Sequence, residues 1–280
     1  MAAPDFLAIG HVTLDRFGDD VRTGGAALYA AVTAHRLGVS AAILTSHGAD
    51  FPLDDVPTAI EVVTVEAPST TVFAHAAGAG GRAMRVEAVA TPLTVKDVPE
   101  DWRQAPLVLL APIVQEVDPA LAGVFGDGTV AAAAQGWLRA VGADGVVAAR
   151  AWASPSAVLD RLQALFVSAE DVRGQEAQLT EWVLRVPLAV VTAGARGALL
   201  YVNGDRFEVR PRPAREVDAT GAGDVFAAAF LLHYQRDADP WAAAEAASCA
   251  ASLSVEGEAW SAVPERAALD AALAEHRARD

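Results

Sequence analysis

The stretch from residue 216 to residue 231, EVDATGAGDVFAAAFL, joins a glycine turn to a carboxylate and then to apolar residues with helical spacing. Gly221 and Gly223 allow successive backbone N–H groups to point to one side, and the following helix adds the positive end of its dipole. Such a turn attracts an anion. Asp224 is either that anion, in an ordinary capped helix start, or a base that acts on a substrate bound at the turn.

The second interpretation makes the turn a site for phosphoryl transfer. The N–H groups would stabilise the charge on a transferred phosphoryl group, while Asp224 would accept the proton of the attacking hydroxyl. Phosphoryl transfer depends mainly on positioning and charge neutralisation, so these two features are chemically sufficient for it.

The composition excludes several other kinds of protein. A formal net charge of -15 argues against nucleic acid or an anionic membrane as the main partner, because such surfaces bind basic patches. Lys96 is the sole lysine, so a G-x-x-x-x-G-K-[ST] phosphate loop is excluded. Cys249 is the sole cysteine, which excludes internal disulfides and cysteine zinc sites. No apolar stretch is long enough for a membrane span, and residues 1–10 lack a positively charged start, so we expect a cytoplasmic protein.

The elements around the turn alternate between strands and helices. Residues 5–10 indicate a buried strand and residues 24–38 a helix closed by glycine, and another strand follows. This β-α-β opening favours a parallel sheet. Further strands are expected at residues 105–113, 145–150, 164–171 and 187–210. The sequence therefore predicts an α/β fold, and 53% hydrophobic residues are enough to bury a large core.

Two local signals supplement this pattern. Residues 69–92 contain two short, partly alternating segments on either side of GAGG at 78–81, which predicts a hairpin that forms a lid or an edge ribbon. Asp239 and Pro240 occupy the N-cap and the first turn of a predicted helix.

Three motifs carry a family resemblance. DATGAGD at 218–224 resembles the D-T-x-G-A-G-D signature of the ribokinase-like, or PfkB, carbohydrate kinases, with Ala219 in place of the usual threonine. The segment TGGAALYAAVTAHRLG at 23–38 is similar to the glycine-rich N-terminal motif of that family. VVTAGARGALLY at 190–201 is similar to the strand, loop and strand that precede the signature. The three occur in the family order and span most of the chain.

The resemblance implies one ribokinase-like domain over residues 1–280. Its expected architecture is a three-layer α/β/α domain with a mostly parallel central sheet and a small β lid from segments near 11–24 and 69–92. ATP with Mg²⁺ is the implied phosphoryl donor. The lid sheets of such kinases often pair, but the short, alanine-rich segments here leave a monomer and a homodimer equally open.

Residue roles follow from the same resemblance. Asp224 takes the role of catalytic base, and the N–H groups of Gly221, Ala222 and Gly223 form the anion hole. The expected ATP-binding residues are Thr192, Gly194, Gly197, Thr220 and Asp218, the last two also bracing the turn. The N-x-x-E element that arranges magnesium through water falls on residues 165–172, where Glu170 and Asp171 are the candidate carboxylates. An acidic loop that merely faces solvent is the alternative.

The acceptor is less well determined. The resemblance places Asp15 against the substrate hydroxyls and implies that Gly24 and Gly25 admit the polyol against the backbone. Gln135 and Arg139 could reach the same pocket, with solvent-facing positions as the alternative. Tyr29 stands where many sugar kinases of the family have asparagine, which argues against ribose or fructose. The strings GGAALYAA and AQGWLR are similar to the short branch that includes myo-inositol kinase-like proteins, so a cyclitol such as myo-inositol is the preferred small-molecule polyol substrate.

Other functions stay open at this point. An ordinary sugar or a nucleoside is the nearest alternative acceptor, and a catalytically silent ligand-binding relative is a further possibility, because SAED at 168–171 departs from the family element. A dehydrogenase would need G-x-G-x-x-G directly after the first strand, and AIGHVTLD lacks it.

Overall fold

A computed structural model describes residues 2–78 and 81–279 of the chain, and the side chains of residues 76–78 and 81–83 are left out of the description. The middle of the predicted GAGG hairpin tip, residues 79–80, therefore lies outside the described residues.

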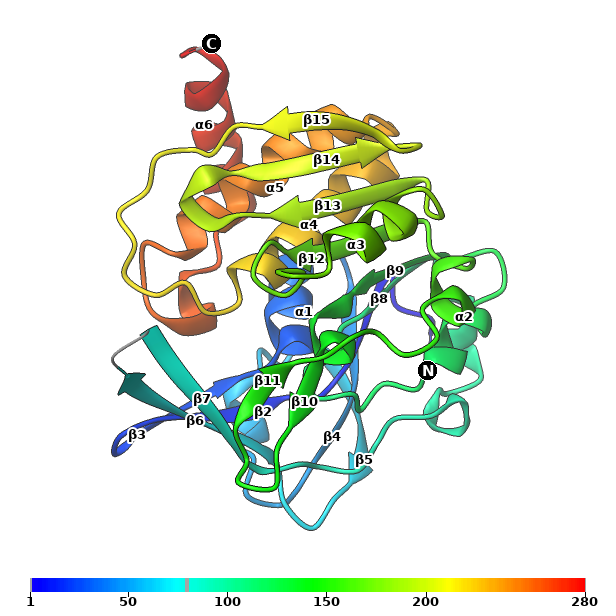
Figure 1. The fold of residues 1–280 in the computed structure, drawn as a ribbon, viewed down its shortest axis with the longest axis vertical. Coiled ribbons are helices and arrows are strands. Elements are labelled where there is room, and N and C mark those ends of the chain that lie inside the picture. Colours follow the sequence, from blue (N-terminus) through cyan, green and yellow to red (C-terminus); the bar gives the residue numbers. More distant parts are fainter. Residues whose placement is uncertain (1, 79–80, 280) are drawn as a thin grey trace.

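Within the described residues, a nine-stranded sheet forms the centre of the fold, in the order β15-β14-β13-β12-β9-β8-β1-β4-β5 (Figure 1). From β13 to β5 each strand pairs parallel to the next, and β14 pairs antiparallel with both of its neighbours. The strands are β1 (Phe6–Ile9), β4 (Ala41–His47), β5 (Glu61–Glu66), β8 (Leu107–Leu110), β9 (Thr129–Ala133), β12 (Ala164–Ser168), β13 (Leu188–Thr192), β14 (Ala198–Val202) and β15 (Asp205–Val209).

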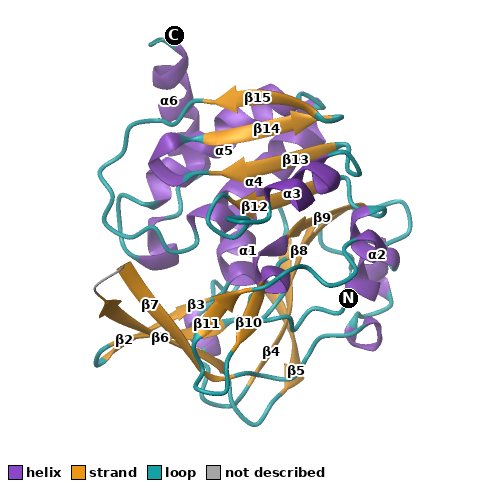
Figure 2. Cartoon of the chain, viewed as in Figure 1, coloured by secondary structure: helices purple, strands orange, loops and turns teal. Residues whose placement is uncertain are grey.

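The sheet has a hydrophobic core on each face, because successive side chains of a strand point to opposite sides. In β1, Phe6 and Ala8 belong to one core cluster, whereas Leu7 and Ile9 belong to the other. The first cluster includes α1 (Ala26–Arg36), α4 (Ala222–Asp237), α5 (Pro240–Ser254) and α6 (Arg266–Arg277); the second includes α2 (Ser156–Leu159) and α3 (Glu176–Val183) (Figure 2). The predicted three-layer α/β fold with a mostly parallel sheet is confirmed.

A second, four-stranded sheet lies beside the lower part of the central sheet, at the lower left in Figure 2. Its order is β3-β2-β6-β7, with β2 and β6 parallel. The strands are β2 (Thr13–Phe17), β3 (Asp20–Gly24), β6 (Thr71–Gly78) and β7 (Gly81–Ala88). Because β2 begins four residues after β1 ends, this small sheet stands at the carboxyl edge of the central sheet, where α/β proteins bind ligands.

The interpretation of residues 129–150 was partly wrong. Residues 129–133, where no strand was expected, form β9 in the middle of the central sheet. Residues 145–150 do not join that sheet: β11 (Val147–Ala149) pairs only with β10 (Arg139–Val141) in a two-stranded ribbon. Alanine has low strand propensity, so TVAAA becomes a strand only because β8 and β12 flank it on both sides.

Helix α5 begins as its sequence indicates. The Asp239 carboxylate accepts hydrogen bonds from the N–H groups of Trp241 (2.9 Å) and Ala242 (3.1 Å), and Pro240 is the first helical residue. Among the helices described, none combines the length and apolar character that a membrane crossing requires.

Candidate active site

The glycine turn ends at Gly221, which has a left-handed backbone (φ 75°) and is the N-cap of α4. The N–H of Ala222 donates to the Ala219 carbonyl (3.3 Å) and that of Asp224 to the Gly221 carbonyl (3.0 Å). For the N–H groups of Gly221 and Gly223, no acceptor is found among the described residues. Gly223 also faces open space, so an incoming anion can approach these two donors at the positive end of α4.

Asp218 and Thr220 hold the turn in shape. Asp218 Oδ1 accepts hydrogen bonds from the Thr220 N–H (3.0 Å) and the Thr220 hydroxyl (2.7 Å). Asp218 Oδ2 accepts from the Ala259 N–H (3.3 Å), so this buried carboxylate also anchors the turn to the segment after α5. The expected bracing role matches these contacts, and a role in ATP binding stays a prediction.

Asp224 lies half-buried in the first turn of α4, near Arg139 and Asp171. Burial raises the pKa of its carboxyl to about 7; Arg139 opposes the rise and Asp171 adds to it. Since an effective general base has a pKa near the working pH, this carboxyl suits proton abstraction from a hydroxyl at neutral pH.

Arg139 is the cation of the site. It begins β10, directly after a 3₁₀ helix (Ala134–Leu138) that follows the carboxyl end of β9. Burial lowers the pKa of its guanidinium, and the carboxylates of Asp171, Asp224 and Glu116 raise it. The structure thus brings Arg139 near the proposed base, whereas the half-buried Gln135 makes no hydrogen bond or ion pair with this group in the described part of the chain.

Of the two candidate magnesium residues, Asp171 is the one within electrostatic reach of Asp224 and Arg139. Asp171 Oδ2 accepts a hydrogen bond from the Ser168 hydroxyl (2.7 Å), and the Asp171 N–H donates to Ser168 Oγ (3.0 Å). Glu170 is exposed to solvent. The described residues hold no cluster of three or more His, Cys, Asp or Glu side chains that fits a metal ion. A Mg²⁺ at Asp171 would therefore take most of its oxygen ligands from phosphate and water, as Mg²⁺ in kinases does.

The predicted nucleotide loop lies beside this carboxylate. Thr192 ends β13 and pairs in register with Ser168 at the end of β12, so the two following loops share one edge of the sheet. Gly194 (φ 58°) faces open space. Gly197 (φ 86°) has a different role, because a β-carbon there would overlap the Val209 carbonyl at the end of β15.

Three of the five expected acceptor residues, Asp15, Gly24 and Gly25, lie in or next to the small sheet. Asp15 is buried on β2 and accepts a hydrogen bond from the Thr13 hydroxyl (3.2 Å). A β-carbon on Gly24 would overlap Asp15 Oδ2, and one on Gly25 (φ 103°) would overlap the His11 carbonyl. Gly24 therefore lets the chain before α1 approach this carboxylate, and Gly25 lets it approach the backbone that follows β1.

Tyr29 connects the acceptor residues to the glycine turn. Its ring is buried against Gly221. Burial raises the pKa of its hydroxyl, and Asp218, Asp15 and Asp224 raise it further. A single neutral phenol thus lies within electrostatic reach of the proposed acceptor carboxylate and the proposed base.

Two further residues near the site carry no sequence signal. The buried Glu116 carboxylate accepts from the N–H groups of Ile113 (2.9 Å), Val114 (2.7 Å) and His11 (3.3 Å), which ties together the chain after β8 and the chain after β1. His75 on β6 stacks on Phe17 at 4.5 Å, and its Nε2 lies 3.7 Å from Asp15 Oδ1. Each is an isolated residue in its local sequence, so only the tertiary structure reveals these contacts.

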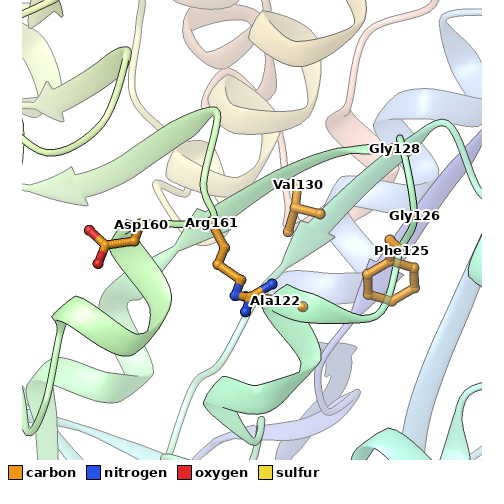
Figure 3. A pocket seen from close by; sticks show the side chains of 8 residues that line it. Ala122, Phe125, Gly126, Gly128, Val130, Asp160 and Arg161 are labelled. Carbon is orange, nitrogen blue, oxygen red and sulfur yellow. The ribbon is translucent and has the colours of Figure 1, made fainter.

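A cleft of about 340 Å³ lies on the opposite edge of the sheet, lined by residues that include Phe125, Val130 and Arg161 (Figure 3). Its wall residues lie at the amino ends of β9 and β12, whereas Arg139 and Asp171 follow the carboxyl ends of the same strands. The cleft is therefore separate from the candidate active site.

Comparison with solved structures identifies the class of fold. A pyrophosphate-dependent kinase in the ribokinase family, solved with a pyrophosphate analog and myo-inositol, matches with a TM-score of 0.79 at 21% identity, over 95% of this chain and 99% of its own. Arabidopsis thaliana ribokinase, solved with ribose and ATP, matches with a TM-score of 0.72 at 18% identity, over 97% of this chain and 99% of its own. The chain thus has the ribokinase fold.

Sequence comparison then relates the chain to known kinases. Residues 131–265 match the model of the pfkB family carbohydrate kinases. A cytidine kinase of Thermococcus kodakarensis is 28% identical over 250 residues, which are 83% of this chain and 89% of the relative. An inositol 3-kinase of Zea mays is 38% identical over 104 residues, 36% of this chain and 27% of the relative. The match to the PfkB family thus lies within residues 131–265, and the chain is a phosphotransferase with an alcohol group as acceptor.

Proposed function

We propose that this protein transfers the γ-phosphoryl group of ATP to a hydroxyl of a small polyol or sugar, with myo-inositol or a related cyclitol as the preferred acceptor. The observation that carries the proposal is the grouping of Asp224, Arg139 and Asp171 at the positive end of α4. This arrangement supplies a general base, a cation and a carboxylate that could bind Mg²⁺ through water, all at one place.

In this mechanism Asp224 accepts the proton of the acceptor hydroxyl, because its pKa of about 7 lets it both lose and gain a proton near neutrality. The N–H groups of Gly221 and Gly223 donate to the transferred phosphoryl group, and Arg139 balances its negative charge. Asp171 is the residue that would hold Mg²⁺ through water, and the ion would supply neutralisation of the phosphate charge of ATP.

The acceptor side of the site supports a polyol. Asp15 offers carboxylate oxygens to hydroxyl donors, and Tyr29 supplies a neutral hydroxyl within electrostatic reach of Asp15 and Asp224. The inositol 3-kinase and the kinase solved with myo-inositol favour a cyclitol. A nucleoside is an alternative acceptor because of the cytidine kinase relative, and a sugar is another because of the ribokinase structure. A silent ligand-binding relative is the non-catalytic alternative.

The small sheet of β2, β3, β6 and β7 serves as the lid in this proposal, since it carries Asp15 and Gly24 at the edge of the site. Closing it over the acceptor would exclude water and limit hydrolysis of ATP. Residues 1–280 then act as one kinase domain with its lid.

Pyrophosphate is the specific alternative to ATP as the phosphoryl donor. The signature motif and the ribokinase structure with ATP support ATP as the donor, whereas a structural neighbour with a TM-score of 0.79 is pyrophosphate-dependent. Purified protein with Mg²⁺ should therefore be assayed with ATP and with pyrophosphate, each against myo-inositol, other cyclitols, ribose, fructose and cytidine. Turnover of a cyclitol with ATP supports the proposal; turnover restricted to pyrophosphate or to a nucleoside corrects it, and no turnover on the whole panel rejects it.

A further inference from the structure

The edge strand β3 of the small sheet contacts the segment between α5 and α6, which descends to the small sheet in Figure 1. The Trp260 indole N–H donates to the Thr23 hydroxyl (3.0 Å). Next to it, Arg22 Nη2 lies 3.6 Å from a Glu258 oxygen. Two neighbouring side chains of β3 thus join the small sheet to the main body of the protein.

Arg22 also reaches the glycine turn. Its Nη1 lies 3.6 Å from Asp218 Oδ2, and its Nε lies 2.6 Å from Asp20 on the same strand. The guanidinium is placed 5.1 Å above the centre of the Phe17 ring. Asp218 is only 6% exposed, so this pair is less screened by solvent than an ordinary surface ion pair.

The two oxygens of Asp218 have different neighbours. Oδ1 holds the N–H and hydroxyl of Thr220, directly before Gly221, whereas Oδ2 faces Arg22 and the Ala259 N–H. A change in the position of Arg22 therefore acts on the carboxylate that shapes the turn. The same strand continues through Gly24 into α1, so Arg22 lies between the acceptor residues and the phosphoryl site.

We propose that Arg22 is a positioning residue that couples the small sheet to the turn at residues 218–224. When β3 lies against the main body, Arg22 orients Asp218 and Asp218 orders the turn, so acceptor binding on the small sheet and donor binding at the turn strengthen each other. This inference rests on the proposed kinase function for its two ligands, but the effect of Arg22 on the turn does not depend on any ligand. Reciprocal coupling of this kind amounts to a factor of about 5 to 150 in affinity.

The first test is hydrogen–deuterium exchange of the full-length protein without substrates. In Arg22→Gln, we expect the hydrogen-bonded amides of Thr220, Ala222 and Asp224 to exchange at least about tenfold faster than in the wild type, with an intermediate rate in Arg22→Lys. Trp260→Phe, which removes the donor to Thr23, should have the same effect in smaller measure. Arg16→Gln is the matched control, because Arg16 pairs with Glu87 inside the same small sheet (3.0 Å) and should leave residues 219–224 unchanged. Unchanged exchange in Arg22→Gln overturns the inference; if that variant unfolds globally, Arg22→Lys and Trp260→Phe decide.

The second test is a steady-state grid of donor against acceptor concentrations. In the wild type the acceptor should lower the donor KM by at least about fivefold, and in Arg22→Gln this factor should fall toward one, while Arg16→Gln keeps it. A wild type without turnover contradicts the proposed function and leaves the exchange experiment to judge Arg22. A wild type that turns over, with an equal coupling factor in Arg22→Gln, contradicts the inference alone.

Discussion

The ring of Tyr29, on α1, lies so close to Gly221, at the start of α4, that a β-carbon on Gly221 would overlap it. The two residues are 192 positions apart in the chain. Gly221 is therefore required twice, once for its left-handed backbone and once for the space that Tyr29 fills. The contact joins the helix that follows the acceptor glycines to the turn that precedes the proposed base.

Gly221→Ala should destabilise the protein by more than a left-handed backbone alone explains. Strain at that backbone conformation costs on the order of 1–3 kcal/mol, and overlap with the Tyr29 ring adds to it. Gly194→Ala is the control, because Gly194 also has a positive φ (58°) but faces open space. Denaturant unfolding of both variants should show a larger loss for Gly221→Ala; equal losses would mean that the Tyr29 ring moves away freely.

Asp224→Asn should remove the proposed base while leaving the turn intact. General-base catalysis contributes about 10²- to 10⁴-fold, so we expect a fall of this size in kcat with little change in either KM. Steady-state kinetics with the identified acceptor measure it. Asp237→Asn, at the exposed other end of α4, is the matched control and should keep its activity. Activity within a few-fold of the wild type in Asp224→Asn would assign the base to another residue.

The pH profile should report the same carboxyl. Because Asp224 acts in its ionised form, kcat/KM should rise with pH and level off above about pH 7. Arg139 favours the ionised form of Asp224. Arg139→Gln should therefore shift the rising part of the kcat/KM profile to higher pH, and Arg139→Lys should shift it less. A limb that stays in place in Arg139→Gln would show that a different group is being titrated.

Asp224 should also reduce stability at neutral and alkaline pH. Its folded pKa, about 7, lies above the ordinary value of 3.8, so the folded protein binds the extra proton between these pH values and stability falls as the pH rises. Asparagine stays neutral, so Asp224→Asn should unfold at higher denaturant than the wild type at pH 8.5, by on the order of 1–2 kcal/mol after allowance for solvent screening. The difference should vanish near pH 3.5. A variant no more stable than the wild type at pH 8.5 contradicts the raised pKa.

Asp171→Asn should weaken the use of magnesium. Since Asp171 is the oriented carboxylate beside the site and Glu170 is exposed, we expect the Mg²⁺ concentration for half-maximal activity to rise several-fold in Asp171→Asn and to stay constant in Glu170→Gln. Asp171 also raises the pKa of Asp224, so its removal should shift the pH limb toward lower pH. If only Glu170→Gln raises the Mg²⁺ requirement, Glu170 and not Asp171 is the magnesium residue.

Much of the fold was readable from local sequence. The apolar run of β1, the cap of α5 at Asp239 and the glycine turn before α4 each depend on neighbouring residues, and the structure agrees with the expectation for each. The strand β9 was not readable, because its alanines have no strand pattern of their own and pair only through β8 and β12.

The candidate site divides along the same line. The sequence by itself determined the turn, its carboxylate and the loop at residues 192–197, because each is a motif of a few adjacent residues. Only the tertiary structure decided that Arg139, Asp171 and Asp224 meet, that Tyr29 fills the space at Gly221 and that Arg22 reaches Asp218. These contacts depend on strand order and helix packing, which place residues from distant parts of the chain at one edge of the sheet.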